Sequence, residues 1–368
     1  MYDNFNISFN NCKAVTVNIN GAAAVSGRPI VSDDDYSSRA AAKQQREVKE
    51  VLSAEIDNYT DKKRLSLILS DIYGDLLLQA RQDRVYNCGT FLEFAVNTSN
   101  SVRLSYINSC KDRLCPTCQF RRGYRLYRQV SQVLANLAAD KGNMYFMLTL
   151  TTVNVSLDML QQEITKVIDA FRVLSRRQEF KKLYKGYVRV VELVVDREQY
   201  ITASMYSRKE VYYRKRGFAP GDLNPNYLKA NVHIHCILHT TKQLYKHNYI
   251  KKARLLELWQ QATQDKRNIV IDIREIKDIK TYYSTAADIN KAVAEVCKYS
   301  VKPLDLIRGD DMDKEVVYAV LNAISGRRLF TAGGTLSVKN ISEDDVNDED
   351  EVFYKYYWHY TQQYRPII

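Results

Sequence analysis

The sequence predicts an α+β protein with a central, mostly antiparallel sheet flanked by helices, and three observations lead to this prediction. Residues 145–152 and 186–195 are apolar and β-branched, which is typical of buried strands. Residues 231–239 form a further apolar run with strand-like alternation. Amphipathic segments predict helices between and after these runs, and the order strand, helix, strand, strand, helix, strand, helix favours an α+β domain.

The other segments are assigned from composition and periodicity. In residues 64–78 apolar positions recur every three or four residues, which predicts an amphipathic helix. The excursion 197–229 contains several Gly and Pro residues, which predict a hairpin or loop over the sheet. Further helices are expected over about 156–184, 247–265 and 284–299, and a strand over 268–273. The division that follows is a poorly ordered arm (1–35), a helical region (36–85), a cysteine-bearing module with a basic helix (86–140), a main domain (141–335) with the insertion 197–229, and an acidic, Tyr-rich tail (336–368).

Length and composition restrict the class of protein. The 368 residues allow two or three domains or one elaborated domain, and 45% hydrophobic with 26% charged residues is the balance of a folded protein. No apolar run reaches the ~20 residues that a membrane helix needs, and the N-terminus lacks a signal-peptide pattern, so we expect a cytoplasmic protein. Lys and Arg exceed Asp and Glu by 54 to 43, which favours a polyanionic partner, although binding to a membrane surface would give a similar surplus.

Basic residues gather in 111–128 and in 207–216, and the chain contains 27 tyrosines. Aromatic side chains interleaved with cations suit single-stranded nucleic acid, because bases stack on the rings while Lys and Arg follow the phosphates. For any single stretch, a solvated hairpin explains the charge equally well. The DNA-binding candidates from these stretches are Arg113, Arg121, Arg122, Arg125, Arg214, Lys215 and Arg216.

The strand-like run 231–239 (NVHIHCILH) contains a histidine pair. On an extended strand, alternate side chains share a face, so the imidazoles of His233 and His235 lie on one side and can bind one metal ion. A hydrogen-bonded, half-buried strand face is the alternative. His239 lies on the same face further along and is not counted among the ligands.

Four cysteines indicate a zinc site. Cys110, Cys115 and Cys118 follow the spacing C-x4-C-x2-C, and the tight turn of a Cys-Pro-x-Cys knuckle brings two thiolates to one ion. Cys88, which Gly follows, is the candidate for the fourth ligand, with Cys12 as a distant alternative. A cytosolic setting argues against disulfides, so we expect structural Zn²⁺ here. The remaining cysteines, Cys236 and Cys297, are expected to be small buried apolar residues.

The last predicted helix contains a carboxylate and a phenol on one face. Glu295 and Tyr299 stand at i and i+4, with Lys291 one turn before Glu295. The simplest alternative is an exposed glutamate paired with that lysine, beside a partly buried tyrosine.

These motifs together resemble those of the rolling-circle plasmid replication initiators (Rep proteins) of the HUH endonuclease superfamily. The resemblance rests on the order of the motifs behind the cysteine knuckle and extends from about Cys88 to Gly334. The segments that carry it are 146–152 (FMLTLTT), 186–192 (GYVRVVE), 232–235 (VHIH), 257–259 (ELW), 295–302 (EVCKYSVK) and 326–334 (GRRLFTAGG). The first 80 residues and the acidic tail fall outside it, and the insertion 197–229 could be specific to this chain.

The resemblance implies an HUH-type domain that nicks one DNA strand at a plasmid origin and joins itself to the DNA. It implies Tyr299 as the nucleophile, which leaves a 5′-phosphotyrosyl link and a free 3′-hydroxyl primer. It implies Glu295 as the base that activates water to close the round by hydrolysis. Lys298 and Lys302 are then phosphate contacts, with solvated lysines as the alternative.

The same resemblance implies a catalytic divalent ion and several partners. His233 and His235 would bind Mn²⁺ or Mg²⁺ together with Glu192, an acid set among valines on one strand face, for which pairing with an arginine is the alternative. The implied partners are single-stranded or hairpin origin DNA, a host helicase and a DNA polymerase, and the protein could be a homodimer.

Two other functions remain open at this point. An HUH transposase or conjugative relaxase would use the same chemistry, but a relaxase usually carries a third histidine and an N-terminal tyrosine, and neither is in place here. A non-catalytic zinc-containing nucleic-acid-binding protein, in which the histidines merely pack, is the second.

Overall fold

The computed structural model describes residues 33–98, 100–138, 140–267, 269–276, 287–297, 306–338 and 351–367. The chain divides into two compact units. Unit 1 comprises residues 1–70, 80–112 and 342–368, and unit 2 comprises residues 71–79 and 113–341. The described part of the chain contains no helix that is both long and apolar enough to cross a membrane.

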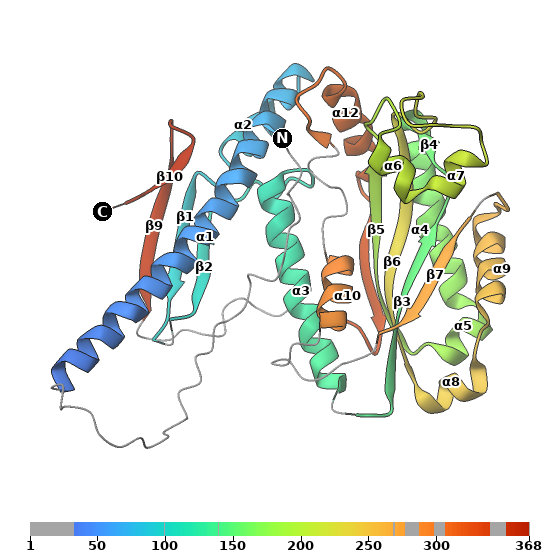
Figure 1. Cartoon of the computed structure of the whole chain (residues 1–368), viewed down its shortest axis with the longest axis horizontal. Helices are drawn as coiled ribbons and strands as arrows, with labels where there is room; N and C mark the ends of the chain where they lie inside the picture. Colours follow the sequence, from blue (N-terminus) through green and yellow to red (C-terminus); the bar gives the residue numbers. More distant parts are fainter. Residues whose placement is uncertain are drawn as a thin grey trace. The chain divides into compact units, whose positions relative to one another are not determined.

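Unit 1 is an antiparallel sheet with a long helix against one face (Figure 1). Phe94 in the first strand is buried on that face, and its ring lies 6.2 Å from the ring of Tyr59 in the helix. The strand order is β10-β9-β1-β2. The elements are α1 (Asp33–Asp75), α2 (Gln79–Tyr86), β1 (Phe91–Val96), β2 (Val102–Ile107), β9 (Val352–His359) and β10 (Gln363–Pro366).

Unit 2 is built on a second antiparallel sheet, ordered β7-β3-β6-β5-β8, with β4 paired to β6. Its strands are β3 (Asn143–Thr151), β4 (Val155–Ser156), β5 (Gly186–Val195), β6 (Lys229–Thr241), β7 (Ile271–Glu275) and β8 (Phe330–Gly334). Its helices are α3 (Pro116–Ala138), the 3-10 turn η2 (Leu157–Met159), α4 (Leu160–Arg176), α5 (Gln178–Leu183), α6 (Ala203–Arg208), α7 (Glu210–Arg214), α8 (Lys242–Asn248), α9 (Lys252–Thr263), α10 (Ala287–Cys297) and α12 (Asp313–Ile324).

Helices cover both faces of the sheet of unit 2, and Figure 1 shows α3 and α10 on one side and α4, α5 and α9 on the other. On the α3/α10 side, a buried apolar cluster joins Val130 of α3 and Val296 of α10 to Val190 of β5. On the opposite side, Phe171 of α4 packs edge-on against Tyr187, with ring centroids 5.2 Å apart. Side chains alternate along a strand, so Val190 and Tyr187 point to opposite faces of the sheet. The candidate site described below lies on the face toward α10.

A glycine allows α3 to approach α10 closely. A Cβ atom on Gly123 would lie 2.8 Å from the carbonyl oxygen of Cys297, a distance that real Cβ contacts do not show. The absence of a side chain at this position therefore sets the spacing between α3 and the C-terminal end of α10.

The predicted α+β architecture with antiparallel sheets is confirmed in the described part of the chain, and β5 has the predicted bounds. Two predicted helices are each split in two. The helix expected over 156–184 is interrupted at Arg177, whose backbone is extended (φ −60°, ψ 139°). The helix expected over 247–265 instead begins earlier as α8 and resumes as α9 after an extended backbone at Lys251.

The insertion differs from the predicted hairpin or loop. It contains two short helices, α6 and α7, and one isolated bridge between Tyr200 and Leu223. The hydroxyl of Thr202 caps α6 by accepting a hydrogen bond from the amide of Met205, at 3.1 Å. This cap satisfies an amide at the start of α6 and favours helix over hairpin.

Two other regions contain strands that were not predicted. Between Cys88 and Cys110 the chain forms the hairpin β1–β2. The described part of the predicted tail, residues 351–367, forms β9 and β10, and residues 352–357 of β9 pair with the whole of β1. This part of the tail therefore completes the sheet of unit 1.

Candidate functional site

The candidate site lies on the face of the unit 2 sheet that is turned toward α10. Glu192 of β5 stands directly opposite His233 of β6, and Val190 stands opposite His235. Residues two apart share a face, so the antiparallel register brings the carboxylate and both imidazoles together.

The three side chains meet at one carboxylate oxygen. Oε2 of Glu192 lies 3.2 Å from Nε2 of His233 and 2.9 Å from Nε2 of His235. Glu192 is 1% exposed, so its charge is removed from water and needs a positive partner. Two donors bound to one octahedral ion at about 2.1 Å lie about 3.0 Å apart, so these separations fit a divalent cation.

Hydrogen bonds on the far side of His233 fix which ring nitrogen carries the proton. The Asn231 amide nitrogen donates to Oδ1 of Asn154 at 2.7 Å and to the carbonyl oxygen of Thr152 at 3.4 Å. Oδ1 of Asn231 therefore faces Nδ1 of His233, at 3.1 Å, and can only accept. In a neutral His233 this arrangement leaves the Nε2 lone pair pointing at the carboxylate, so a cation or an extra proton must lie between them.

His235 is held in a similar way. The hydroxyl of Thr149, its direct cross-strand neighbour on β3, lies 3.2 Å from Nδ1 of His235. Each histidine thus turns Nε2 toward Glu192 while its other nitrogen contacts a polar side chain, the arrangement that metal-binding histidines commonly show.

A second carboxylate reaches the same place from α10. Oε1 of Glu295 lies 3.3 Å from Nε2 of His235, and its side chain is 33% exposed. Val293 and Val296 are buried in the apolar cluster beneath α3, so their packing turns Glu295 toward the sheet. Three other predicted residues of this region, Tyr299, Lys298 and Lys302, lie outside the described residues.

His239 belongs to the core. Its Nδ1 lies 2.7 Å from the hydroxyl of Thr335, and its ring centroid is 5.2 Å from that of Tyr145. It is 3% exposed, and burial lowers the pKa of its imidazole from the ordinary value of 6.5. Its surroundings therefore favour a neutral packed ring.

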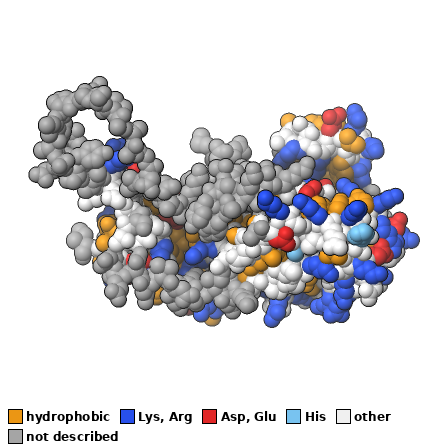
Figure 2. Space-filling view, turned by 90° about the horizontal axis from the view of Figure 1, so that it is seen from below, with side chains coloured by type: hydrophobic (Ala, Val, Ile, Leu, Met, Phe, Trp, Pro, Cys, Tyr) orange, Lys and Arg blue, Asp and Glu red, His pale blue; other side chains and the backbone are white. Residues whose placement is uncertain are grey.

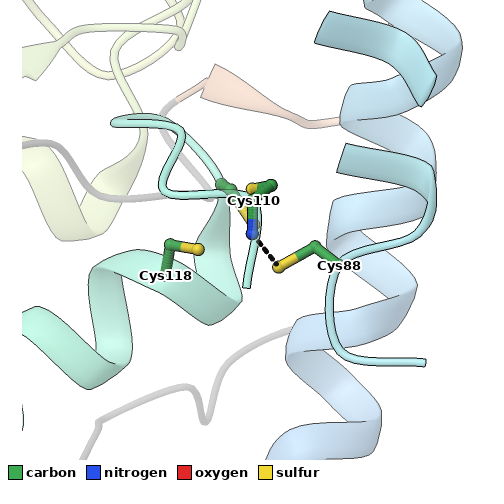
Figure 3. Close-up of side chains that lie close together, drawn as sticks. Cys88, Cys110 and Cys118 are labelled. Carbon is green, nitrogen blue, oxygen red and sulfur yellow. Dashed lines mark hydrogen bonds between the residues drawn. The ribbon is translucent and has the colours of Figure 1, made fainter. Parts of the chain in front are cut away.

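The four predicted zinc ligands Cys88, Cys110, Cys115 and Cys118 offer sulfur atoms that all lie within 4.8 Å of one another. Figure 3 shows three of them turned toward one another, with the amide of Cys110 donating to the sulfur of Cys88 at 3.4 Å. Tetrahedral zinc, with bonds of about 2.3 Å, places its sulfur ligands about 3.8 Å apart, so the cluster fits this ion. Cys12, the alternative ligand, lies outside the described residues.

Neighbouring groups also suit thiolates. The amide of Asp112 donates to the sulfur of Cys110 at 3.4 Å, and hydrogen bonds of this kind stabilise the charged form of a thiol. By contrast, Cys236 and Cys297 are almost fully buried, and burial raises the pKa of both thiols. Those two stay neutral, as expected of small buried side chains.

The basic candidates fall into two groups on unit 2. Arg121 is half-buried on α3 whereas Arg122 and Arg125 are exposed there, and Arg113 donates to the carbonyl oxygen of Ile324. Figure 2 shows Lys and Arg side chains spread over the part of the surface that unit 2 forms in that view.

The second group lies at the end of α7. Arg214, Lys215 and Arg216 are exposed, and the Arg216 guanidinium lies 4.0 Å from the centroid of the Tyr212 ring. The sequence had suggested aromatic rings interleaved with cations in this stretch, and Arg216 and Tyr212 form such a pair.

Sequence reasoning missed the supporting side chains Thr149, Asn154 and Asn231. A signal was present for two of them. Asn231 has the same strand parity as the histidines, and Thr149 belongs to the apolar run that pairs with them. Asn154 lies in the loop after β3, where the sequence carried no comparable signal.

Comparisons with known proteins show what the chain is similar to. Residues 101–362 match the model of a family described as replication protein, Rep_1. The chain is 28% identical to a "Protein rep" of Streptococcus pneumoniae, over 80% of this chain and 86% of the relative. It is 27% identical to a "Protein rep" of Staphylococcus aureus (68% and 95%) and 25% identical to one of Bacillus amyloliquefaciens (76% and 80%). No solved structure matches the chain.

Proposed function

The chain belongs to the Rep_1 family of replication proteins, and from this premise we propose that it is an HUH-type initiator that nicks plasmid origin DNA through Tyr299. The membership confirms the resemblance to Rep proteins drawn from the motifs. The chemistry is our proposal, and the observation that carries it is the meeting of Glu192, His233 and His235 at one carboxylate oxygen.

We assign these three residues to a catalytic Mn²⁺ or Mg²⁺ ion. The fit is supported by the inward lone pair of His233, by the buried charge of Glu192 and by separations of 3.2 Å and 2.9 Å. When bound, such an ion supplies Lewis-acid polarisation of the phosphoryl group. Asn231 and Thr149 keep the two imidazoles in the orientation that binding requires.

Tyr299 is the nucleophile in this proposal. A phenol has a pKa near ~10 and is a poor nucleophile at neutral pH, so it must be aligned with the phosphate and must lose its proton as the bond forms. A bond forms between the phenolic oxygen and phosphorus, and the bond from phosphorus to the 3′ oxygen breaks. That oxygen takes up a proton and becomes the primer hydroxyl. Lys298 and Lys302 would hold neighbouring phosphates.

Glu295 closes the round. Its carboxylate accepts a proton from a water molecule that then attacks a phosphodiester, so that the final bond is hydrolysed and replication ends. Its position 3.3 Å from His235 supports this role, because it places the base beside the proposed ion.

The rest of the chain would bind DNA and partners. The cysteine cluster fits structural Zn²⁺ at the start of α3, beside the exposed Arg122 and Arg125. Together with the basic end of α7, these arginines would contact single-stranded or hairpin origin DNA. A host helicase and a DNA polymerase would act on the nicked product, and a homodimer is compatible with this scheme.

An adduct assay on denaturing gels, with a parallel binding assay, tests the proposal against the non-catalytic alternative. Wild-type protein incubated with Mn²⁺ and labelled single-stranded origin oligonucleotides should give a denaturant-resistant protein–DNA adduct. The Tyr299→Phe protein should lose the adduct and still bind the oligonucleotides. Cleavage that survives this substitution would contradict the assigned nucleophile, and binding with no adduct in the wild type would favour the non-catalytic alternative.

A further inference from the structure

A cavity of about 210 Å³ lies in unit 2, near Glu192, His233 and His235, the three proposed metal ligands. It is lined by Arg113, by residues of α3, α10 and β5, and by residues from the end of α12 to the start of β8. One lining residue, Val190, stands opposite His235 in the sheet, and another, Val296, follows Glu295 in α10. The cavity therefore lies beside the residues proposed to bind the ion.

Four arginines line this cavity: Arg113, Arg122, Arg327 and Arg328. No acidic residue is among the described residues that line it. Such a concentration of like charge is unfavourable unless an anion offsets it.

Three of these arginines have no carboxylate partner in the described part of the chain. Arg327 donates to the hydroxyl of Thr165 and to the carbonyl oxygen of Ser325, both at 3.0 Å, and both acceptors are neutral. Arg122 and Arg328 are exposed, and neither pairs with any described side chain. The guanidinium groups of Arg122 and Arg328 are therefore available to bind a ligand. Arginine binds phosphate with two parallel hydrogen bonds, which makes a phosphate group the fitting anion.

The size and the apolar wall of the cavity restrict the ligand further. Its volume of about 210 Å³ is below the ~300–1,000 Å³ typical of small-molecule sites. Leu126 and Phe330 provide apolar contact beside the arginines. The cavity has room for only part of one nucleotide, and its charged rim is open. It therefore suits one segment of a longer DNA strand better than a free nucleotide.

We propose that this cavity binds a non-scissile phosphodiester of the strand being cut, with Arg122 and Arg328 as its phosphate ligands. This inference rests on the proposed function, because it assumes that the DNA strand is cut at the ion held by Glu192, His233 and His235. The site would hold the strand on one side of the scissile bond and so set its position relative to the ion.

Salt dependence of binding tests the contacts. The double variant Arg122→Gln/Arg328→Gln is compared with Arg176→Gln, which removes an exposed arginine from α4 on the opposite face of the sheet. Binding is measured in the Tyr299→Phe background, so that no strand is cut. The slope of log affinity against log salt should become shallower by about 0.7 in the double variant, because each phosphate neutralised on single-stranded DNA contributes about 0.7. The Arg176→Gln protein should keep the original slope.

A neutral-backbone scan then locates the phosphate. A set of oligonucleotides is used, each with a single methylphosphonate at a different position. Their affinities are measured for the Tyr299→Phe protein and for the double variant in the same background. The Tyr299→Phe protein should lose affinity at a position near the cut, and the double variant should be insensitive at that position. Slopes and scans equal to those of Arg176→Gln would overturn the proposal, as would competition by free dAMP that is strong in the background protein and lost in the double variant. The scan measures binding alone, so a wild type without adduct would contradict the proposed function, whereas the difference between the two proteins at one phosphate position would still test the arginine contacts.

Discussion

Glu192 and His233 are direct cross-strand neighbours whose Oε2 and Nε2 atoms lie 3.2 Å apart, although both atoms are acceptors when His233 is neutral. The orientation of Asn231, which donates on its other side to Asn154 and Thr152, creates this opposition. Two acceptors at this distance repel each other unless a positive charge lies between them. The pair is therefore prepared for a cation by side chains on the far side of His233.

Asn231 should control metal affinity. The Asn231→Ala protein loses the acceptor that holds Nδ1 of His233, and we expect its affinity for Mn²⁺ to fall about 10–100-fold, as with other residues that orient metal-binding histidines. Titration followed by electron paramagnetic resonance measures this. The Asn231→Asp protein keeps an acceptor oxygen and should recover most of the affinity. Equal affinities in all three proteins would show that Asn231 does not orient His233.

Gly123 should set the position of α10. A methyl group at this position would lie 2.8 Å from the carbonyl oxygen of Cys297. We expect Gly123→Ala to lower the free energy of unfolding by about 1–3 kcal/mol, the range for overpacked sites, and to slow adduct formation because Glu295 moves with the helix. The control is Gly142→Ala, whose added methyl group would first meet the movable carboxylate of Asp140 at 3.0 Å. Similar urea midpoints for the two variants would argue against a close contact between α3 and α10.

The cysteine cluster should bind zinc. Wild-type protein is expected to contain about one zinc ion per chain, and Cys115→Ser should lose most of it, since a structural site needs all four ligands. Atomic absorption measures the metal content. The Cys236→Ala protein, altered at a buried cysteine of the β6 strand, is the matched control and should retain its zinc. Unchanged zinc content in Cys115→Ser would rule out the cluster as the site.

His239 should make stability depend on pH. Burial lowers the pKa of its imidazole below the ordinary value of 6.5, so the unfolded chain binds a proton at a higher pH than the folded one. The stability that this group contributes is present above pH 6.5 and is lost as the pH falls from that value toward the lowered pKa. Urea unfolding over this range should show a smaller loss of stability in His239→Gln than in the wild type. Identical slopes would mean that His239 does not titrate on unfolding.

Local periodicity accounts for the parts of the site that could be predicted. An alternation of two residues places His233 and His235 on one face, and the apolar composition of β5 marks it as a strand that holds Glu192. The spacing of cysteines likewise indicated the cluster that the structure brings together. Each of these features lies within about 30 residues of chain.

Tertiary pairing and capping account for what was missed. Pairing of Phe91 with Tyr357 joins segments that are remote in the sequence, and short strands carry too little signal to reveal such a partner. In the insertion, α6 begins at a local cap made by the hydroxyl of Thr202. The arginine cavity needs α3 and the start of β8 to be neighbours, and no local pattern could indicate that.

Metal dependence of adduct formation tests the central claim most directly. The rate of adduct formation is measured against Mn²⁺ concentration in the wild type and in His235→Ala, with the cross-linked peptide sequenced by mass spectrometry. The account predicts a saturable Mn²⁺ dependence in the wild type, DNA attached to Tyr299, and loss of saturation in His235→Ala. Equal Mn²⁺ curves for the two proteins, or DNA attached to another residue, would contradict it.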